Sequence, residues 1–287
     1  MGAAIIVLAE ALLIAGEPFV SHWITPIAWT GYLLLTDALI YRRTGRSLMV
    51  SNRLELLVLA CISVACWWLF EFYNTPRFWR SDMELWWHYH DIVRNPYLRR
   101  VGYDWAFATI FPALFQTAEL ISLRWRRADA PRPAPARPRP RAPLYALIVL
   151  GAVGSVLPFV VISTWLVPLV WTAPLVLLDP LNALRGWPAL TADLARGHWR
   201  RLAALACAGL ICGVLWEFWN YWALSRWTYT VPYLGDVKIF EMPVLGYLGY
   251  PPFACECWAL YVFLRSLLGG RPVGAQTSAD QIVIDLQ

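Results

Sequence analysis

Seven acidic residues lie inside apolar segments that carry no Lys or Arg near their centres: Glu17, Asp37, Glu71, Glu119, Asp179, Glu217 and Glu256. An ionised carboxylate in hydrocarbon costs at least ~2.5–3.5 kcal/mol, so each group must face a protein interior, accept hydrogen bonds or hold a proton. A buried carboxyl group that keeps its proton near neutral pH is a general acid. It can also join two helices by a hydrogen bond, and helix packing is therefore the alternative interpretation of each one.

The acidic residues recur in two copies along the chain. Residues 59–74 and 205–220 are identical at 8 of 16 positions, and both end in Glu-Phe-aromatic-Asn. Residues 26–37 and 168–179 share a Trp-Thr pair and a terminal Asp. A third and looser match includes Glu256. We interpret the chain as an internal duplication, and the residues that both copies keep as its candidate site.

We predict Glu71 and Glu217 as the acid and base groups, with Glu256 as a second proton carrier. Asn74 and Asn220, three residues after the first two glutamates, would orient them. The other predicted substrate-binding residues are aromatic or acidic neighbours: Trp68, Trp216, Trp219, Tyr221, Glu17 and Glu241. Aromatic faces attract cations by about 2 kcal/mol or more when desolvated, so such a pocket would shelter a carbocation or bind a quaternary ammonium group. Interfacial belts of Trp and Tyr are the alternative explanation of the aromatic content.

His88, His90 and Asp91 form the one cluster that has metal-ligand spacing in the sequence. A His-x-His pair followed by Asp is a weak zinc signal, and it would need a further carboxylate such as Glu71. We predict instead that residues 76–98 form an amphipathic helix at the outer membrane surface. Neither a metal nor a cofactor is assigned to the candidate site.

Composition places the elements that carry these residues in a membrane. The 287 residues are 59% hydrophobic and 15% charged, whereas soluble domains are about 45–50% apolar and about 25% charged. An ordinary soluble enzyme is thereby excluded. A span needs roughly 20 mostly apolar residues, and eight segments qualify: 3–20, 25–41, 54–73, 102–123, 144–162, 165–183, 201–223 and 244–268. We predict an all-α polytopic transmembrane helical bundle of about eight spans, arranged as two parallel four-helix repeats.

Basic residues predict the orientation of these spans. With the N-terminus inside, 17 of the 24 Lys and Arg residues lie in cytoplasmic segments, as the positive-inside rule requires. The net charge of +5 then reflects membrane topology, and no nucleic-acid partner is expected. Both termini are cytoplasmic, in a bacterial-type inner membrane. Glu71 and Glu217 lie near the outer face, while Asp37 and Asp179 lie near the inner face as caps or hinge residues.

Four regions follow one another along the sequence. An N-terminal four-span repeat covers residues 1–123, and a C-terminal four-span repeat covers residues 144–268. Residues 124–143 form an Arg/Pro-rich cytoplasmic linker, which we predict to be an extended tether, with contact to anionic lipid as the alternative. Residues 269–287 form a flexible tail.

A duplicated polytopic chain with retained acidic residues and dense aromatic residues resembles the membrane-integral lycopene (carotenoid) cyclases, which are built from two homologous halves. The resemblance rests on this plan and on a loose string: Asn220-Tyr-Trp-Ala223, Arg226-Trp227, Glu241-Met-Pro243 and Glu256. The Pro-x-Glu-Glu signature of those enzymes is replaced here by Phe-Glu-Met-Pro. The resemblance implies cofactor-free acid–base isomerisation of an isoprenoid.

Three classes of function stay open. The leading hypothesis is an integral membrane enzyme that cyclises, isomerises or hydrates an isoprenoid or carotenoid lipid without a cofactor. A proton-coupled transporter or a lipid-binding protein would use the same carboxylates for protons or a cationic solute. A scaffold subunit of a membrane complex would use the paired motifs only for packing. The expected partner is a membrane lipid, and the sequence leaves the oligomeric state open.

Overall fold

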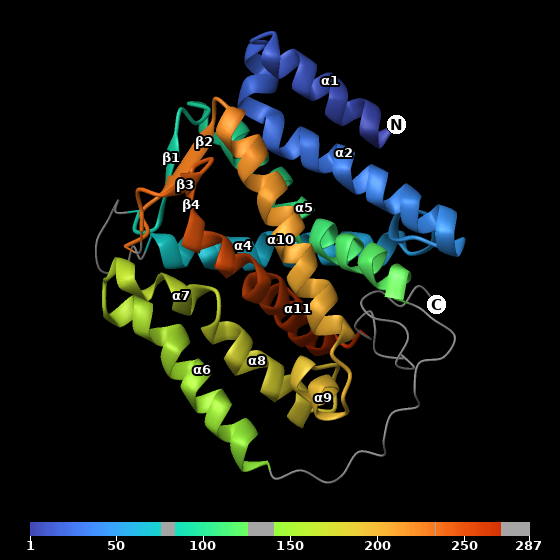
Figure 1. Cartoon of the computed structure of the whole chain (residues 1–287), viewed down its shortest axis with the longest axis vertical. Coiled ribbons are helices and arrows are strands. Elements are labelled where there is room, and N and C mark those ends of the chain that lie inside the picture. The colour runs from blue at the N-terminus through green and yellow to red at the C-terminus, as the bar shows by residue number, and fades with distance from the viewer. Residues whose placement is uncertain (76–83, 126–140, 233, 271–287) are drawn as a thin grey trace.

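The computed structural model describes residues 1–75, 84–125, 141–232 and 234–270, and it is mostly helical (Figure 1). The helices of the first half are α1 (Gly2–Ile14), α2 (Pro18–Thr44), α3 (Leu48–Ser51), α4 (Arg53–Asn74) and α5 (Pro96–Trp125). Those of the second half are α6 (Ala142–Val160), α7 (Val167–Val170), α8 (Ala173–Leu184), α9 (Leu190–Ala195), α10 (Arg200–Trp222) and α11 (Tyr250–Leu267). Short 3₁₀ helices, η1 (Thr164–Leu166) and η2 (Val244–Gly249), precede α7 and α11.

Six helical segments of the described residues are long and apolar enough to cross a membrane: Pro18–Thr44, Arg53–Asn74, Pro96–Trp125, Ala142–Val160, Thr164–Leu184 and Arg200–Trp222. α1 has 13 residues and reaches about 20 Å at 1.5 Å per residue, which is less than the ~30 Å of a hydrocarbon core. The helices are therefore consistent with a membrane protein. The total of eight crossings stays a prediction.

α2 begins earlier in the chain than the predicted second span. The Glu17 carboxylate accepts a hydrogen bond from the Val20 amide (2.6 Å) and caps a helix that starts with Pro18, a residue suited to a first helical position. Pro26, the predicted start, lies inside α2, where the Thr30 hydroxyl donates to its carbonyl oxygen (2.7 Å). Glu17, predicted to contact substrate, is thus placed as a helix cap.

Corresponding pairs of helices pack together in the two halves. α1 packs on α2, α2 on α5 and α4 on α5, and the order recurs as α6 on α8, α8 on α11 and α10 on α11. Between the halves α5 packs on α10 and α4 on α11 (Figure 1). Large side chains of α5 and α11 are fully buried in the core: Phe111, Phe115, Trp258 and Tyr261. The packing follows the order of the sequence repeat, and the duplication itself stays an interpretation.

Four short strands lie at one end of the helices (Figure 1). They are β1 (Trp87–His90), β2 (Arg226–Tyr229), β3 (Lys238–Ile239) and β4 (Met242–Pro243). β1 pairs antiparallel with β2, and β3 pairs antiparallel with β4. The register of the first pair sets Trp87 opposite Tyr229 and Tyr89 opposite Trp227. Because β1 comes from the first half and β2 from the second, this strand pair joins the two halves.

The predicted amphipathic helix over residues 76–98 is wrong for the part that the structure describes. Residues 87–90 form β1, and a helix begins only at Pro96; residues 76–83 lie outside the described part. In β1, Trp87 and Tyr89 alternate with His88 and His90. Alternate residues of a strand point to opposite faces, so this pattern is typical of a strand with one covered face. The pairing with β2 supplies the backbone hydrogen bonds that decide the conformation.

The two repeated aspartates lie at the opposite end of the helices, where each caps a short helix. Asp37 accepts a hydrogen bond from the backbone N–H of Met49 in α3 (3.1 Å). Asp179 accepts from the N–H groups of Leu190 (2.6 Å) and Thr191 (2.8 Å) in α9. The first N–H groups of a helix lack partners within it, so both carboxylates satisfy donors that would otherwise be unpaired. Of the two predicted roles, caps or hinge residues, these contacts support the first, and the inner side of the membrane stays a prediction.

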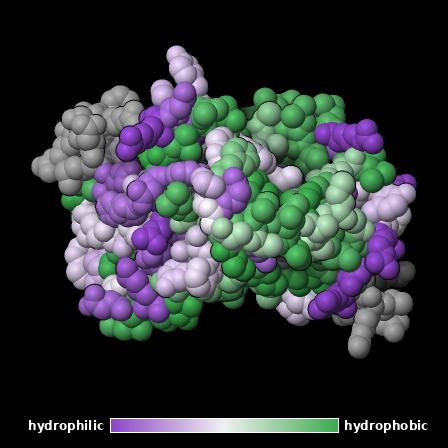
Figure 2. Space-filling view, turned by 90° about the horizontal axis from the view of Figure 1, so that it is seen from above, coloured by the Kyte–Doolittle hydropathy of each residue, from purple (hydrophilic) through white to green (hydrophobic). Residues whose placement is uncertain are grey.

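The outer helices present apolar side chains to their surroundings. Five residues of α6 are exposed aliphatic residues: Val149, Leu150, Val153, Val156 and Val160. Figure 2 shows a broad hydrophobic area on one side of the face in view, with hydrophilic residues gathered beside it. Soluble proteins rarely expose large contiguous apolar patches, so this surface fits a hydrocarbon surrounding.

Candidate functional site

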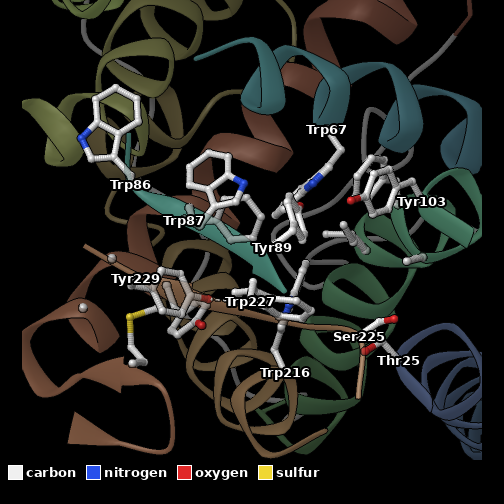
Figure 3. Close-up of a pocket in the computed structure, with 18 of the residues that line it drawn as sticks. Thr25, Trp67, Trp86, Trp87, Tyr89, Tyr103, Trp216, Ser225, Trp227 and Tyr229 are labelled. Atoms are coloured by element: carbon white, nitrogen blue, oxygen red, sulfur yellow. Dashed lines mark hydrogen bonds between the residues drawn. The ribbon is translucent and has the colours of Figure 1, made fainter. Parts of the chain in front are cut away.

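A cavity of about 400 Å³ lies next to β1 and β2, among helices of both halves (Figure 3). Its wall is mostly apolar, and its Trp, Tyr and Phe residues are Trp23, Trp29, Trp67, Trp86, Trp87, Trp171, Trp216, Trp227, Tyr89, Tyr103, Tyr229, Tyr250, Phe107 and Phe253. Among the described residues that line the cavity, Arg99 is the one Lys, Arg, Asp or Glu. A volume of this size, with apolar walls and few polar groups, is typical of a small-molecule site.

Aromatic residues of the two halves pack against one another around the cavity. The rings of Trp216 on α10 and Trp67 on α4 are stacked with centroids 5.2 Å apart. Trp29 on α2 meets Trp216 edge-on at 5.9 Å. Trp171, the counterpart of Trp29 in the sequence repeat, lies 5.3 Å from Phe253 on α11. The cavity wall therefore depends on both halves of the chain.

Glu71 lies behind the wall and holds three of its aromatic residues. Its Oε1 atom accepts hydrogen bonds from the indole N–H groups of Trp67 (3.1 Å) and Trp87 (3.2 Å) and from the Tyr89 hydroxyl (2.5 Å). These three residues line the cavity, whereas Glu71 does not. The carboxylate is therefore connected to the cavity through their N–H and O–H groups.

Glu217 has the corresponding place in the second half and is fully buried. Its Oε1 atom accepts hydrogen bonds from the hydroxyls of Tyr229 (2.7 Å) and Tyr250 (2.6 Å). The Trp227 indole donates in turn to the Tyr229 oxygen (2.6 Å). The Oε2 atom of Glu217 is buried without a hydrogen-bond partner among the described residues. Glu217 thus keeps one oxygen available, although a buried polar atom without a partner is costly.

One hydrogen-bond donor differs between the two glutamates: Glu71 accepts from Trp67 on its own helix α4, whereas Glu217 accepts from Tyr250 on α11. Trp67, four residues before Glu71, aligns with Gly213, four residues before Glu217. A Cβ atom on Gly213 would lie 2.3 Å from the Tyr250 ring, so the glycine makes room for that ring. Tyr250 therefore supplies to Glu217 the donor that Trp67 supplies to Glu71.

Asn74 and Asn220 hold the strand that follows each glutamate. The Asn74 Oδ1 atom accepts from the backbone N–H groups of residues 85–87, and its Nδ2 atom donates to the Trp87 carbonyl oxygen (2.7 Å). Asn220 accepts from the Trp227 N–H (2.9 Å) and donates to the Trp227 carbonyl oxygen (2.8 Å). The asparagines therefore position the aromatic residues around the glutamates, and their predicted role in orienting the carboxylates stays a prediction.

The two strand tyrosines are the hydroxyl groups that connect the cavity to the glutamates. Burial and the adjacent Glu71 carboxylate raise the pKa of Tyr89 well above its ordinary value. Burial and Glu217 raise the pKa of Tyr229 in the same way. Both phenols therefore keep their protons at neutral pH. A phenol with one side on the cavity and the other on a carboxyl group can carry a proton between them.

The predicted aromatic residues divide between the cavity and other contacts. Trp216 lines the cavity. The Trp68 indole donates to Asp104 on α5 (2.7 Å), and the Trp219 indole donates to Glu10 on α1 (3.1 Å). Neither Trp68 nor Trp219 is among the described lining residues. The Trp68 indole therefore joins α4 to α5 within the first half, and the Trp219 indole joins α10 to α1 across the two halves.

Three further predicted residues lie away from the wall. Tyr221 is 39% exposed at the surface. Glu241 lies 4.0 Å from the guanidinium of Arg226. Glu256 is fully buried in α11, and neither of its carboxyl oxygens has a hydrogen-bond partner among the described residues. The three predicted catalytic glutamates are therefore not gathered at one point.

Sequence reasoning missed Tyr89, Tyr229 and Tyr250. A signal for the first two was present, because Trp87-His-Tyr-His and Arg226-Trp-Thr-Tyr each place a Trp and a Tyr two residues apart. This spacing puts both aromatic residues on one face of a strand. The same segments are equally typical of an interfacial aromatic belt, which is why the pattern was not decisive.

The histidine cluster is spread along the other face of the strand pair. The His88 Nε2 atom lies 2.7 Å from the Thr230 hydroxyl, and the His90 Nε2 atom lies 2.8 Å from the Thr228 hydroxyl. In the part of the chain that the structure describes, no group of three or more His, Cys, Asp or Glu residues could hold a metal ion.

Comparison of the chain with protein-family models, with curated proteins and with solved structures finds no match.

Proposed function

We propose that the protein is an integral membrane enzyme that performs cofactor-free acid–base chemistry on an isoprenoid-type lipid in the aromatic cavity. The observation that carries this proposal is that two phenols of the wall, Tyr89 and Tyr229, are each hydrogen-bonded to a glutamate behind it. Apolar walls suit an isoprenoid chain, and ring faces stabilise the positive charge that protonation of a double bond creates.

The chemistry would balance within the substrate and the protein. A glutamate and its phenol deliver one proton to an alkene carbon, so an O–H bond breaks, a C–H bond forms and the adjacent carbon becomes cationic. Attack by a second double bond closes a ring, and loss of a proton from a neighbouring carbon returns it to the deprotonated pair. No electrons are exchanged with a cofactor. Glu217, with its free Oε2 atom, is the better proton store, while the Glu71 carboxylate accepts three hydrogen bonds at one oxygen.

The finer topology belongs to the same proposal. Eight spans in two parallel repeats, with both termini in the cytoplasm of a bacterial-type inner membrane, would place the strand pair and the cavity at the outer side. The resemblance to membrane-integral lycopene cyclases supports an isoprenoid substrate and a two-half plan. Glu71 and Glu217, which the sequence repeat suggested, act in this proposal through tyrosines.

Solvent deuterium tests this proposal directly. The purified full chain is incubated in D₂O with the isoprenoid that co-purifies with it in mild detergent, and products are analysed by mass spectrometry. Proton addition at carbon followed by loss of another proton should place one deuterium in the product. Glu71→Gln and Glu217→Gln should lower this incorporation by at least about 100-fold, the usual contribution of general acid–base catalysis.

Glu10→Gln is the matched control for these variants. Glu10 also accepts an indole N–H, from Trp219, but Trp219 does not line the cavity, whereas the donors to Glu71 and Glu217 do. This variant should therefore keep full incorporation. Incorporation that is unchanged in the Glu71→Gln and Glu217→Gln double variant would refute the proposal. Lower thermal stability without any change in chemistry would favour a scaffold.

A transporter is the second candidate, and Glu256 is the observation that favours it. Its carboxyl group is fully buried in α11 without a hydrogen-bond partner among the described residues. Such a group within a membrane bundle is expected to bind a proton or a cation. Proton-coupled solute uptake into proteoliposomes that is lost in Glu256→Gln would support this function. A transporter of this kind would place no deuterium in a lipid product.

A further inference from the structure

The cavity has a polar end, and that end carries a positive charge. Arg99, in the first turn of α5, is half-buried and lines the cavity, although the residues beside it are exposed. Among the described residues, no carboxylate forms an ion pair with it. Arg100, the next residue, differs: it pairs with Asp104 (2.7 Å) and stacks on Trp68.

Two acidic residues that interact with the wall are hydrogen-bonded to other groups. Glu84 accepts a hydrogen bond from the Tyr89 backbone N–H (3.1 Å) and lies 3.6 Å from His88. Glu71 accepts three hydrogen bonds from wall residues. Arg99 is the one charged side chain among the described residues that line the cavity, so its guanidinium is the charged group that can meet a ligand there.

Further polar side chains of the wall lie on the adjoining part of α2 and before β2. The His22 Nδ1 atom lies 2.8 Å from the Ser225 hydroxyl, and both residues line the cavity. α2 and α5 meet here, because a Cβ atom on Gly102 would lie 3.4 Å from the Trp23 ring. Figure 3 shows Ser225 and Thr25 in one corner of the cavity, away from Trp86 and Tyr229.

We propose that the cavity binds a lipid that has an isoprenoid tail and one anionic head group, a phosphate or a carboxylate. The head group pairs with Arg99, while the tail lies among the tryptophans. This inference rests on the proposed function, since it names the substrate class of the same cavity. Charge complementarity excludes a cationic head group at this end, and a pure hydrocarbon would leave the guanidinium without a partner.

The test compares three probes by calorimetric titration of the full chain in mild detergent: farnesyl monophosphate, farnesol and inorganic phosphate. Farnesyl monophosphate should bind at least about tenfold more tightly than farnesol, the gain expected from one hydrogen-bonded ion pair. Inorganic phosphate should bind far more weakly than either lipid. Equal affinities for the two lipids would overturn the proposal, and equal affinities for the two phosphates would show an ion site without a lipid.

Two arginine variants make the test specific. Arg99→Gln should reduce the preference for the phosphorylated lipid to about one, and Arg99→Lys should retain most of it because the charge remains. Arg100→Gln is the matched control and should keep the full preference. A preference that survives Arg99→Gln, or that falls equally in Arg100→Gln, would overturn the assignment.

Glu217→Gln separates this inference from the proposed chemistry. It should abolish deuterium incorporation while the head-group preference is kept. If incorporation persists but the preference depends on Arg99, the acid–base chemistry fails and the lipid site stands. If incorporation is lost but no preference exists in the unaltered protein, the lipid site fails and the chemistry stands.

Discussion

Tyr89 and Tyr229 are the residues at which the cavity and the buried carboxyl groups meet. Each hydroxyl donates to a glutamate at 2.5–2.7 Å, and each ring lines the cavity. Neither glutamate lines the cavity, so each reaches a ligand only through its donors, which include these phenols. Substitution by phenylalanine removes the hydroxyl group and keeps the ring. It therefore separates a role in packing from a role in proton transfer.

Tyr229→Phe removes this oxygen and keeps the ring. We expect deuterium incorporation to fall by about 100-fold or more, with little change in lipid binding, because the apolar wall is preserved. Tyr97→Phe is the control, since Tyr97 is 82% exposed. If Tyr229→Phe lowers lipid affinity and turnover to the same extent, the hydroxyl serves binding and not proton transfer.

Asn74 and Asn220 are the residues on which the strand element depends. Asn74 satisfies three backbone N–H groups and one carbonyl oxygen of a segment that is otherwise outside regular helices. These contacts turn the chain at the end of α4 and deliver Trp87 and Tyr89 to the cavity. The same side chain thus serves stability and the geometry of the site.

Asn74→Ala should therefore destabilise the protein strongly. Each buried N–H group that loses its partner costs about 1–3 kcal/mol, so we expect a total of roughly 3 kcal/mol or more, measured by thermal unfolding in detergent. Asn95→Ala is the control: Asn95 accepts from two N–H groups at an exposed helix start, and its loss should cost about 1 kcal/mol. Equal losses in the two variants would contradict this role.

Long elements were predictable from the sequence, and short ones were not. The predicted spans at 54–73 and 201–223 nearly coincide with α4 and α10, because hydropathy over some 20 residues decides such helices. Asp37 and Asp179 lie inside α2 and α8 and cap the neighbouring helices α3 and α9, which the position of a carboxylate in one segment does not reveal. β1 and β2 have four residues each and are 135 residues apart, and a local pattern does not reveal a partner at that distance.

The candidate site was predictable in part for the same reason. The repeated Glu-Phe-aromatic-Asn segments pointed to Glu71, Glu217 and the two asparagines. The positions of the phenol donors depend on how β1 pairs with β2, and this pairing cannot be read from either strand's sequence alone. Pro26 misled the prediction of α2, because the helix continues through this proline from Pro18 to Thr44.

At the scale of the whole molecule, the proposed topology predicts which turns face each side of the membrane. In a chain without its native cysteines, Ala15→Cys would lie in the turn between α1 and α2, and Arg43→Cys near the end of α2; both positions are exposed. A membrane-impermeant maleimide applied to intact spheroplasts should label residue 15 and spare residue 43. The reverse pattern would invert the orientation, and labelling of both would show that α2 does not cross.

The exchange of Trp67 in one half for Gly213 and Tyr250 in the other limits how such a chain can change over generations. A tryptophan at position 213 would collide with Tyr250, since even a Cβ atom there lies 2.3 Å from its ring. Loss of Tyr250 alone would remove one of the two hydroxyls that bind Glu217. Neither step back toward the Trp67 arrangement is tolerated unless the other accompanies it. The order of substitutions, and not only their sum, therefore governs which descendants of this chain remain functional.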